Sequence, residues 1–330
     1  MRTHALLSFC LLAGSVACTR EIDLLLPVSS PQLVLNGLLH PDSTIQISLT
    51  TTIPVAADST DFPLVDNATV RLYEDGDLVG GLVFQDSLYI LDYHPKAGSE
   101  YTVQAEVPGF KKVSATDRMP YLLDAQACTL QESPNGSPYF WFKTTVHDHP
   151  LESNFYWLYI VITNYGDRVC EYFPDRNPSF VCIGDSSTLF TQKAEFLHSY
   201  SILPDKFNAA VDNTDGGVTI YDGYIRVGDN VLNGETFSLE MTLDGYPMFR
   251  YEDLNPLDSN QTVQLKIANS SQHYDRYLKS SWIYFLNNDY FYNPNPFSET
   301  TQIYSNIKNG TGIFAAYNSL SIDLQDYPCE

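Results

Sequence analysis

The first two dozen residues constrain this chain more than any other stretch, because they decide where the rest of it works. Arg2 is the only ionised side chain before residue 18, an apolar run follows at residues 5–13, and residues 14–17 are small. This order is typical of an export signal. The apolar run is much shorter than the roughly 20 residues that span a bilayer, so residues 1–17 are predicted to be a signal peptide and not a membrane helix.

Cys18 directly follows the small residues. The arrangement resembles a bacterial lipoprotein signal, in which a peptidase cuts before the cysteine and the new N-terminus is acylated. The resemblance implies that Cys18 carries lipid and that residues 18–23 form an anchor and tether. Ser15 departs from the leucine usual at that position. The alternative is an ordinary secretory signal cut after Ala17, which would leave a free periplasmic protein.

The composition predicts a globular protein. Residues 18–330 are long enough for two domains, and 44% hydrophobic with 13% aromatic residues is too apolar for a disordered chain. The net charge of −22 repels phosphate backbones and anionic lipid surfaces at neutral pH, so nucleic acid is excluded as a partner. No second long apolar run follows the signal, so the mature protein is expected outside the bilayer.

Four cysteines remain for the mature domain: Cys128, Cys170, Cys182 and Cys329. An even number in an oxidising compartment predicts disulfides. Cys170 and Cys182 flank a turn-rich stretch and are expected to close that loop, which leaves Cys128 with Cys329. Paired cysteines at zinc-finger spacing are absent from the sequence, so no metal is expected.

Short alternating runs separated by turn residues predict a mainly β fold. Residues 24–118 contain six or seven such runs and are expected to form an immunoglobulin-like β-sandwich. Within them, residues 67–110 resemble the transthyretin-like or carboxypeptidase-regulatory type of module. A boundary near 118–124 then opens a larger β-rich domain over residues 119–330, with aromatic-rich strands at 139–146 and 155–162.

One helix is predicted near residues 271–287, capped by Ser270 or Ser271. Its apolar stripe, spaced as on one helix face, is expected to pack on the sheet, while Asp275, Arg276 and Lys279 point to water.

Residues 284–297 are rich in tyrosine, asparagine and proline. We expect a contact surface there for a small ligand, peptide, glycan or partner protein, with these candidates: Tyr284, Tyr290, Phe291, Tyr292, Asn295 and Phe297. The alternative is that Phe291 and Phe297 are buried anchors.

Three shorter patterns have simpler explanations. His147, Asp148 and His149 alternate as metal ligands on a strand can, but no third ligand site is assignable. Residues 212–217 resemble part of a calcium loop without its closing acid, and a turn is favoured. Residues 184–186 match the opening of a serine esterase motif, but the sequence contains no Asp-x-x-His to activate Ser186. No cofactor and no catalytic residue are predicted.

The closing residues carry a family resemblance: 295–297, 303–307 and 309–317. They are similar to the final motif of a Bacteroidota lipoprotein family catalogued as domain of unknown function 4249, usually encoded beside TonB-dependent outer-membrane receptors. The resemblance implies a non-catalytic accessory or binding subunit of a nutrient-uptake system, lipid-anchored at the outer membrane on the cell surface. Gly310 and Gly312 are expected to serve close packing. The alternatives are a secreted hydrolase (esterase, peptidase or glycosidase) and a surface adhesin or structural module.

Overall fold

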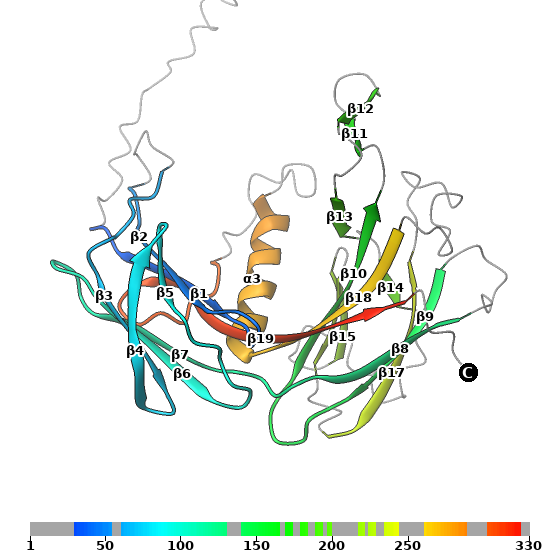
Figure 1. Ribbon diagram of the computed structural model, residues 1–330, viewed down its shortest axis with the longest axis horizontal. Coiled ribbons are helices and arrows are strands. Elements are labelled where there is room, and N and C mark those ends of the chain that lie inside the picture. The colour runs from blue at the N-terminus through cyan, green and yellow to red at the C-terminus, as the bar shows by residue number, and fades with distance from the viewer. Residues whose placement is uncertain are drawn as a thin grey trace, which may run out of the picture.

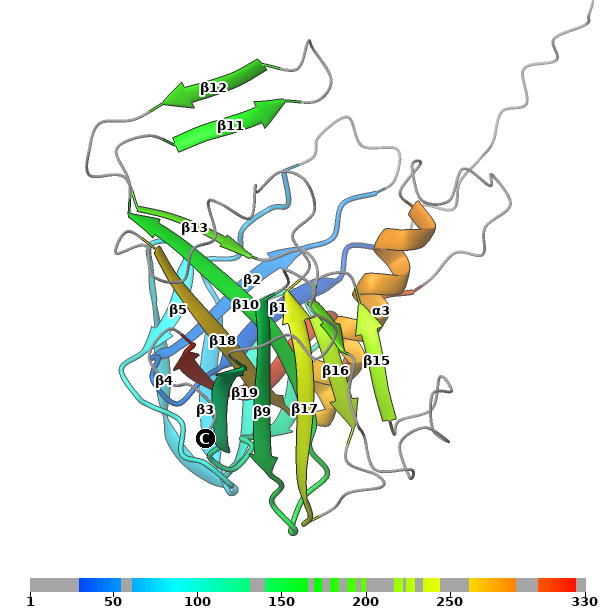
Figure 2. The same cartoon turned by 90° about the vertical axis from the view of Figure 1, so that its right-hand side faces the viewer.

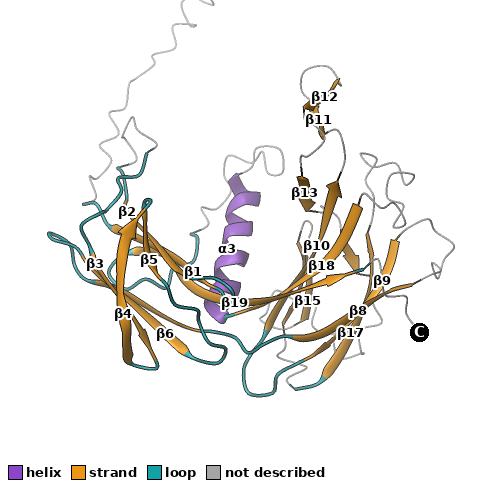
Figure 3. Ribbon diagram, viewed as in Figure 1, coloured by secondary structure: helices purple, strands orange, loops and turns teal. Residues whose placement is uncertain are grey.

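The computed structural model describes most of the chain between residues 30 and 324. The described ranges are 30–54, 61–130, 140–165, 169–173, 179–183, 189–193, 197–199, 217–221, 224–228, 234–243, 261–288 and 302–324. Within them the fold is mainly β, as the sequence predicts, with one helix (Figure 3).

The N-terminal half is built from short strands in which buried and less buried residues alternate. Their bounds are β1 (Leu33–Leu39), β2 (Ile45–Thr51), β3 (Thr69–Glu74), β4 (Asp77–Gln85), β5 (Leu88–Leu91), β6 (Glu100–Glu106) and β7 (Val113–Arg118). In β1 the buried residues occupy every second position, as expected where one face of a sheet covers a core. In β2 the apolar residues Ile45, Ile47 and Leu49 alternate with polar ones in the sequence and are the buried ones, so there the sequence pattern shows which face is buried.

The C-terminal half contains the remaining strands and the helix. The strands are β8 (Asp124–Leu130), β9 (Phe140–His147), β10 (Phe155–Tyr165), β11 (Val169–Phe173), β12 (Ser179–Ile183), β13 (Leu189–Lys193), β14 (Leu197–Ser199), β15 (Gly217–Tyr221), β16 (Tyr224–Gly228), β17 (Thr236–Leu243), β18 (Gln261–Ser270) and β19 (Thr311–Asp323). The helix α3 (Gln272–Asn288) starts within one residue of its predicted position.

Three sheets result from the pairing of these strands. The largest has the order β15-β16-β10-β18-β19-β1-β2-β5-β4-β3-β6-β7, with β13 paired to β10. A four-stranded sheet has the order β14-β17-β9-β8, and β11 pairs with β12. Figure 2 shows β9 and β17 lying over the strands of the large sheet.

The last strand, β19, joins the two halves of the molecule. Its first residues pair in parallel with β1, from Val34↔Thr311 to Leu39↔Ala316. Its later residues pair antiparallel with β18, from Ser270↔Tyr317 to Gln264↔Asp323. Figure 1 shows β19 running beneath the base of α3 from one half to the other. The division at residues 118–124 stays a prediction, but β19 contributes to both halves.

Two separate hydrophobic cores lie on either side of this joint. The first is formed by β1 to β7 with Ile307, Phe314 and Ala316 from the C-terminal segment. The second contains residues from both sheets of the C-terminal half, including Phe142 and Phe237 from the four-stranded sheet and Leu158 and Leu265 from the large one. The described part of the chain therefore buries its apolar residues in two cores, and β19 contributes to both.

The closing motif has a structural role at this joint, as the sequence predicts. Gly312 has a φ of +108°, and a Cβ there would lie 2.1 Å from the Leu35 carbonyl oxygen. A Cβ at Gly310 would lie 2.6 Å from the Leu33 carbonyl oxygen. The Asn306 side chain donates to the Phe314 carbonyl at 2.7 Å and accepts from the Phe314 N–H at 3.0 Å. These residues let β19 approach β1 closely.

Candidate functional site

A buried ion pair fixes helix α3 to the sheet beneath it. Asp275 accepts from Arg226 Nε at 2.6 Å and from Arg226 Nη2 at 2.8 Å, and both side chains are 1% exposed. Trp157 Nε1 donates to Asp275 at 3.0 Å, and Lys279 Nζ lies 3.2 Å from it. The prediction that Asp275 points to water is therefore wrong. Because β16 places Arg226 under the helix, the Asp275 carboxylate is buried as the partner of that guanidinium.

The base of α3 is fixed by a second buried carboxylate, Asp117, at the end of β7. Ser271 accepts from the Tyr274 N–H at 3.1 Å, which caps the helix, and its hydroxyl donates to Asp117. Asp117 also accepts from the Ala316 N–H of β19 at 2.8 Å. One carboxylate thus connects β7, β19 and the start of α3.

This carboxylate predicts a pH-dependent stability. Burial raises the pKa of Asp117 to about 7, although hydrogen bonds from Ser271 and two backbone N–H groups oppose the shift. A raised pKa in the folded state means that the contribution to stability is complete below about pH 4 and is lost as the pH rises through about 7. Asp117→Asn keeps an acceptor but does not titrate. Between about pH 4 and pH 7, we expect the free energy of unfolding in urea to fall by about 2–4 kcal/mol less in Asp117→Asn than in the unmodified protein. Parallel pH profiles of the two proteins would contradict the assignment.

A segment before β19 is held against the exposed side of α3. Tyr304 stacks on His273 at an interplanar angle of 16°, and its hydroxyl lies 2.6 Å from His273 Nδ1. The Tyr304 N–H donates to Ser280 Oγ at 2.8 Å. Burial, and then the charge of Arg276, lower the pKa of His273, so the imidazole is expected to be neutral at pH 7. These contacts hold the segment around Tyr304 against the helix, where it forms one wall of a groove.

Between this wall and the helix lies a groove of about 510 Å³, called the α3 groove below. Its lining residues are Arg276, Lys279, Ser280, Ile283, Gln302, Ile303, Tyr304 and Ser305. The described lining residues include two cations and no carboxylate, although the chain carries a net charge of −22. Ile283 is 46% exposed, and the Arg276 guanidinium lies 5.9 Å from the Tyr304 ring centroid. Such a surface suits a partner segment with both an apolar side chain and a carboxylate.

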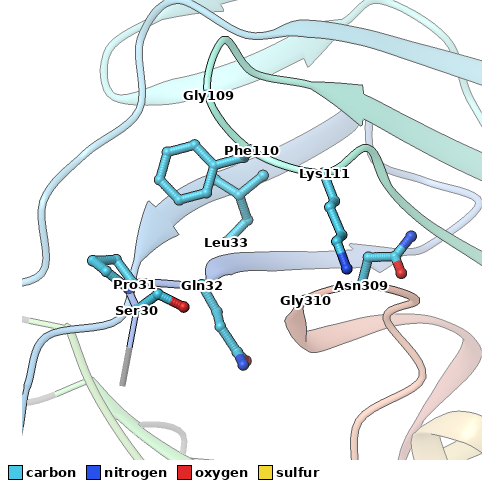
Figure 4. A pocket seen from close by; sticks show the side chains of 9 residues that line it. All are labelled: Ser30, Pro31, Gln32, Leu33, Gly109, Phe110, Lys111, Asn309 and Gly310. Carbon is cyan, nitrogen blue, oxygen red and sulfur yellow. The ribbon is translucent and has the colours of Figure 1, made fainter. Parts of the chain in front are cut away.

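A second hollow, of about 590 Å³, lies where the described chain begins. It is called the entry notch below, and its lining residues are Ser30, Pro31, Gln32, Leu33, Gly109, Phe110, Lys111, Asn309 and Gly310 (Figure 4). In Figure 4 the Lys111 side chain runs toward Asn309, and Phe110 lies next to Leu33. The lining residues that the structure describes again offer hydrogen-bond donors and one cation but no carboxylate.

Comparison with known families gives a match to the model of DUF4249, a domain of unknown function, over residues 19–323. The chain belongs to the DUF4249 family. A search of the curated proteins found no match. The match begins one residue after Cys18, so the predicted signal and its cysteine lie outside the family domain. The family carries no established activity, so the function of this DUF4249 chain is argued from its surfaces.

Of the predicted contact residues, the structure places Tyr284 alone. It lies on the last turns of α3 and is exposed. Tyr290, Phe291, Tyr292, Asn295 and Phe297 lie outside the described residues. The α3 groove could not be predicted from the sequence, because its two walls are about twenty residues apart in the chain. The alternation of polar and apolar residues in 302–305 gives no signal that this segment lies along the helix.

Of the three shorter sequence patterns, the histidine pattern lies within the described residues. His147 Nδ1 lies 2.7 Å from Thr236 Oγ1, and His149 stacks on Tyr121. Asp148 between them is buried and accepts from Asn154 and Tyr156. In the described part of the chain, no group of three or more His, Cys, Asp or Glu is placed to hold a metal ion. Residues 184–186 and 212–216 lie outside that part.

The cysteines are placed only in part. Cys170 and Cys182 are direct partners in the antiparallel ladder of β11 and β12. Cys128 lies opposite Lys143 in β9 and is not a free thiol. Cys18 and Cys329 lie outside the described residues. Among the described helices, none is long and apolar enough to span a membrane.

Proposed function

We propose that this DUF4249 protein is a lipid-anchored, non-catalytic accessory subunit of a TonB-dependent nutrient-uptake system at the outer membrane, exposed at the cell surface. The observation that carries the proposal is the α3 groove, which offers apolar and cationic side chains on a strongly acidic protein. The leader and Cys18 support the anchor. The family resemblance supports the receptor, because members of the Bacteroidota family that it resembles are usually encoded beside one.

The position of the α3 groove supports a docking role more than an enclosed binding role. The C-terminal half of α3 points away from β19 (Figure 1), so Ile283 and Tyr284 are accessible to a large partner. Arg276 forms no ion pair with any carboxylate of the described residues, so a partner's carboxylate can pair with it without displacing any of them. The base of the helix is meanwhile fixed by Asp275 and Asp117, so little is lost in ordering the surface on binding.

Co-purification tests this function. The native protein, extracted in mild detergent, is expected to bring down an outer-membrane receptor identified by mass spectrometry. Arg276→Glu and Ile283→Asp are each expected to lower the recovery of that receptor about tenfold, since each removes a contact worth about 1.4 kcal/mol. Leu122→Asp is the control, because Leu122 is exposed and outside the groove. A protein that never recovers a receptor, in cells whose uptake is unchanged without it, would contradict the proposal.

The finer architecture is also proposed. We interpret residues 24–118 as an immunoglobulin-like β-sandwich completed by the start of β19, and the C-terminal half as a second sandwich of two sheets. The shared core of the four-stranded and large sheets supports the second assignment. A Cys170–Cys182 disulfide is supported by the strand register, because directly opposed residues have Cα atoms about 4.5–5.5 Å apart, within the range for disulfides. The pairing of Cys128 with Cys329 stays a prediction.

A further inference from the structure

We propose that one end of the N-terminal half contacts the membrane, namely the end at which the described chain begins with Ser30. Phe62 and Leu64 would enter the lipid interface, and Lys111 and Lys308 would lie among the headgroup phosphates. These residues, with those of the entry notch, are called the tether face below. The inference deepens the proposed function and rests on its lipid anchor, but it adds a defined orientation of the protein on the bilayer.

Backbone hydrogen bonds bring the parts of this face together from three distant segments. The Thr52 N–H donates to the Gln32 carbonyl at 2.9 Å, and the Thr51 N–H donates to the Pro63 carbonyl at 3.0 Å. The segment that carries Phe62 and Leu64 therefore lies beside the point of chain entry. On the other side of the notch, Asn309 Nδ2 donates to the Lys112 carbonyl at 3.0 Å.

Phe62 and Leu64 of this face are exposed without cover from the described chain. Phe62 is 59% exposed and Leu64 is 45% exposed, whereas the next residue, Val65, is buried in the first core. An aromatic and an aliphatic side chain presented together beside a lipid attachment point are suited to the boundary between headgroups and acyl chains. Water is a poor solvent for both, so contact with the interface is favourable.

Two exposed lysines of the tether face can contact headgroup phosphates. Lys111 and Lys308 are exposed, and neither forms an ion pair with a described carboxylate, whereas Lys112 lies 3.3 Å from Glu106. The net charge of −22 does not prevent the contact. At physiological ionic strength the Debye length is about 8 Å, so remote carboxylates are screened from the lipid surface while the lysines touch it. Asp61 and Asp66 are also exposed, on either side of Phe62 and Leu64, so the two lysines are needed to offset these carboxylates at the lipid surface.

The length of the tether makes this face the part of the fold that meets the membrane. Ser30 is the twelfth residue after Cys18, and even a fully extended chain over that stretch spans only about 40 Å. A lipid chain holds a protein more stably when a second membrane signal acts with it. The exposed apolar pair and the two lysines supply such a signal at the correct end.

Quenching of tryptophan fluorescence by brominated phospholipids tests this orientation. The lipidated Phe62→Trp variant is placed in vesicles of phosphatidylethanolamine with phosphatidylglycerol, and the signal of the unmodified protein is subtracted. We expect strong loss of the added fluorescence and a blue shift. Adding Lys111→Glu and Lys308→Glu should lower the quenching, since each lysine favours an anionic surface about fivefold. The matched control is Leu151→Trp, because Leu151 is 78% exposed on the turn between β9 and β10.

Equal quenching of the Phe62→Trp and Leu151→Trp variants, or none of either, would overturn the orientation. The mass of the Cys18 peptide, read on the same sample, separates this result from failure of the anchor. If that peptide carries no lipid, the anchor of the proposed function fails, and the mature chain is attached by an N-terminal histidine tag to nickel-chelating lipid instead. The same comparison of variants then decides whether the tether face contacts the bilayer.

Discussion

Gly312→Ala is expected to destabilise the fold by more than about 4 kcal/mol, in the range reached only by severe core or backbone defects. The added Cβ would lie 2.1 Å from the Leu35 carbonyl oxygen and 2.8 Å from Asn36 Oδ1, at a φ of +108°. Both neighbours belong to β1, and Asn36 Oδ1 accepts from the Ile313 N–H at 3.2 Å. Since β1 cannot move without disturbing β2, the pairing of β19 with β1 must open. Urea unfolding followed by circular dichroism measures the loss.

Gly76→Ala is the matched control for this experiment. Gly76 has a φ of +92°, close to that of Gly312, but an added Cβ there meets nothing within 4 Å. It therefore isolates the cost of the backbone conformation, about 1–3 kcal/mol. Equal losses in the two variants would mean that the contact with β1 has no cost and that the joint between the two halves relaxes freely.

The fold was predictable to the extent that local patterns decide it. Alternation in residues 45–49 predicts a strand, and an apolar stripe with a serine cap predicts the helix, because burial and capping act on neighbouring residues. The pairing of β19 with both β1 and β18 could not be predicted from such local patterns. Pairing of Leu35 with Gly312 joins residues at opposite ends of the chain, and the glycines only indicate that something approaches closely.

The candidate site was also predicted only in part, because local patterns decide only some of its features. Position on the helix correctly placed Arg276 at the surface, and Tyr284, a contact candidate from the tyrosine-rich composition of residues 284–297, is also exposed. It failed for Asp275, because a charged residue beside an apolar stripe is usually solvated and only the tertiary structure shows that Arg226 lies below it. The one sequence signal was Arg226 itself, a cation within an apolar β run. Its charge requires a partner if that run is buried.

Asp275→Ala is expected to lower the free energy of unfolding by about 3–5 kcal/mol, because it leaves the guanidinium of Arg226 buried without its carboxylate. Arg226 and Asp275 are each 1% exposed, so water cannot replace the lost partner without opening the base of α3. Trp157 Nε1 loses an acceptor at the same time. Urea unfolding of the variant measures the loss, and Arg276→Ala is the control, since Arg276 is exposed on the next position of the same helix.

The double variant Arg226→Met with Asp275→Leu separates the charge from the packing of the helix. Removing both members of a buried ion pair is often neutral, whereas removing one is costly, so the double variant should recover most of the stability lost by Asp275→Ala. The α3 groove should recover with it, since Arg276 and Lys279 project from the helix that the ion pair fixes. Receptor recovery should therefore be low in Asp275→Ala and restored in the double variant. A double variant as unstable as the single one would assign the effect to packing around Trp157, and the ion pair would not be what positions the groove.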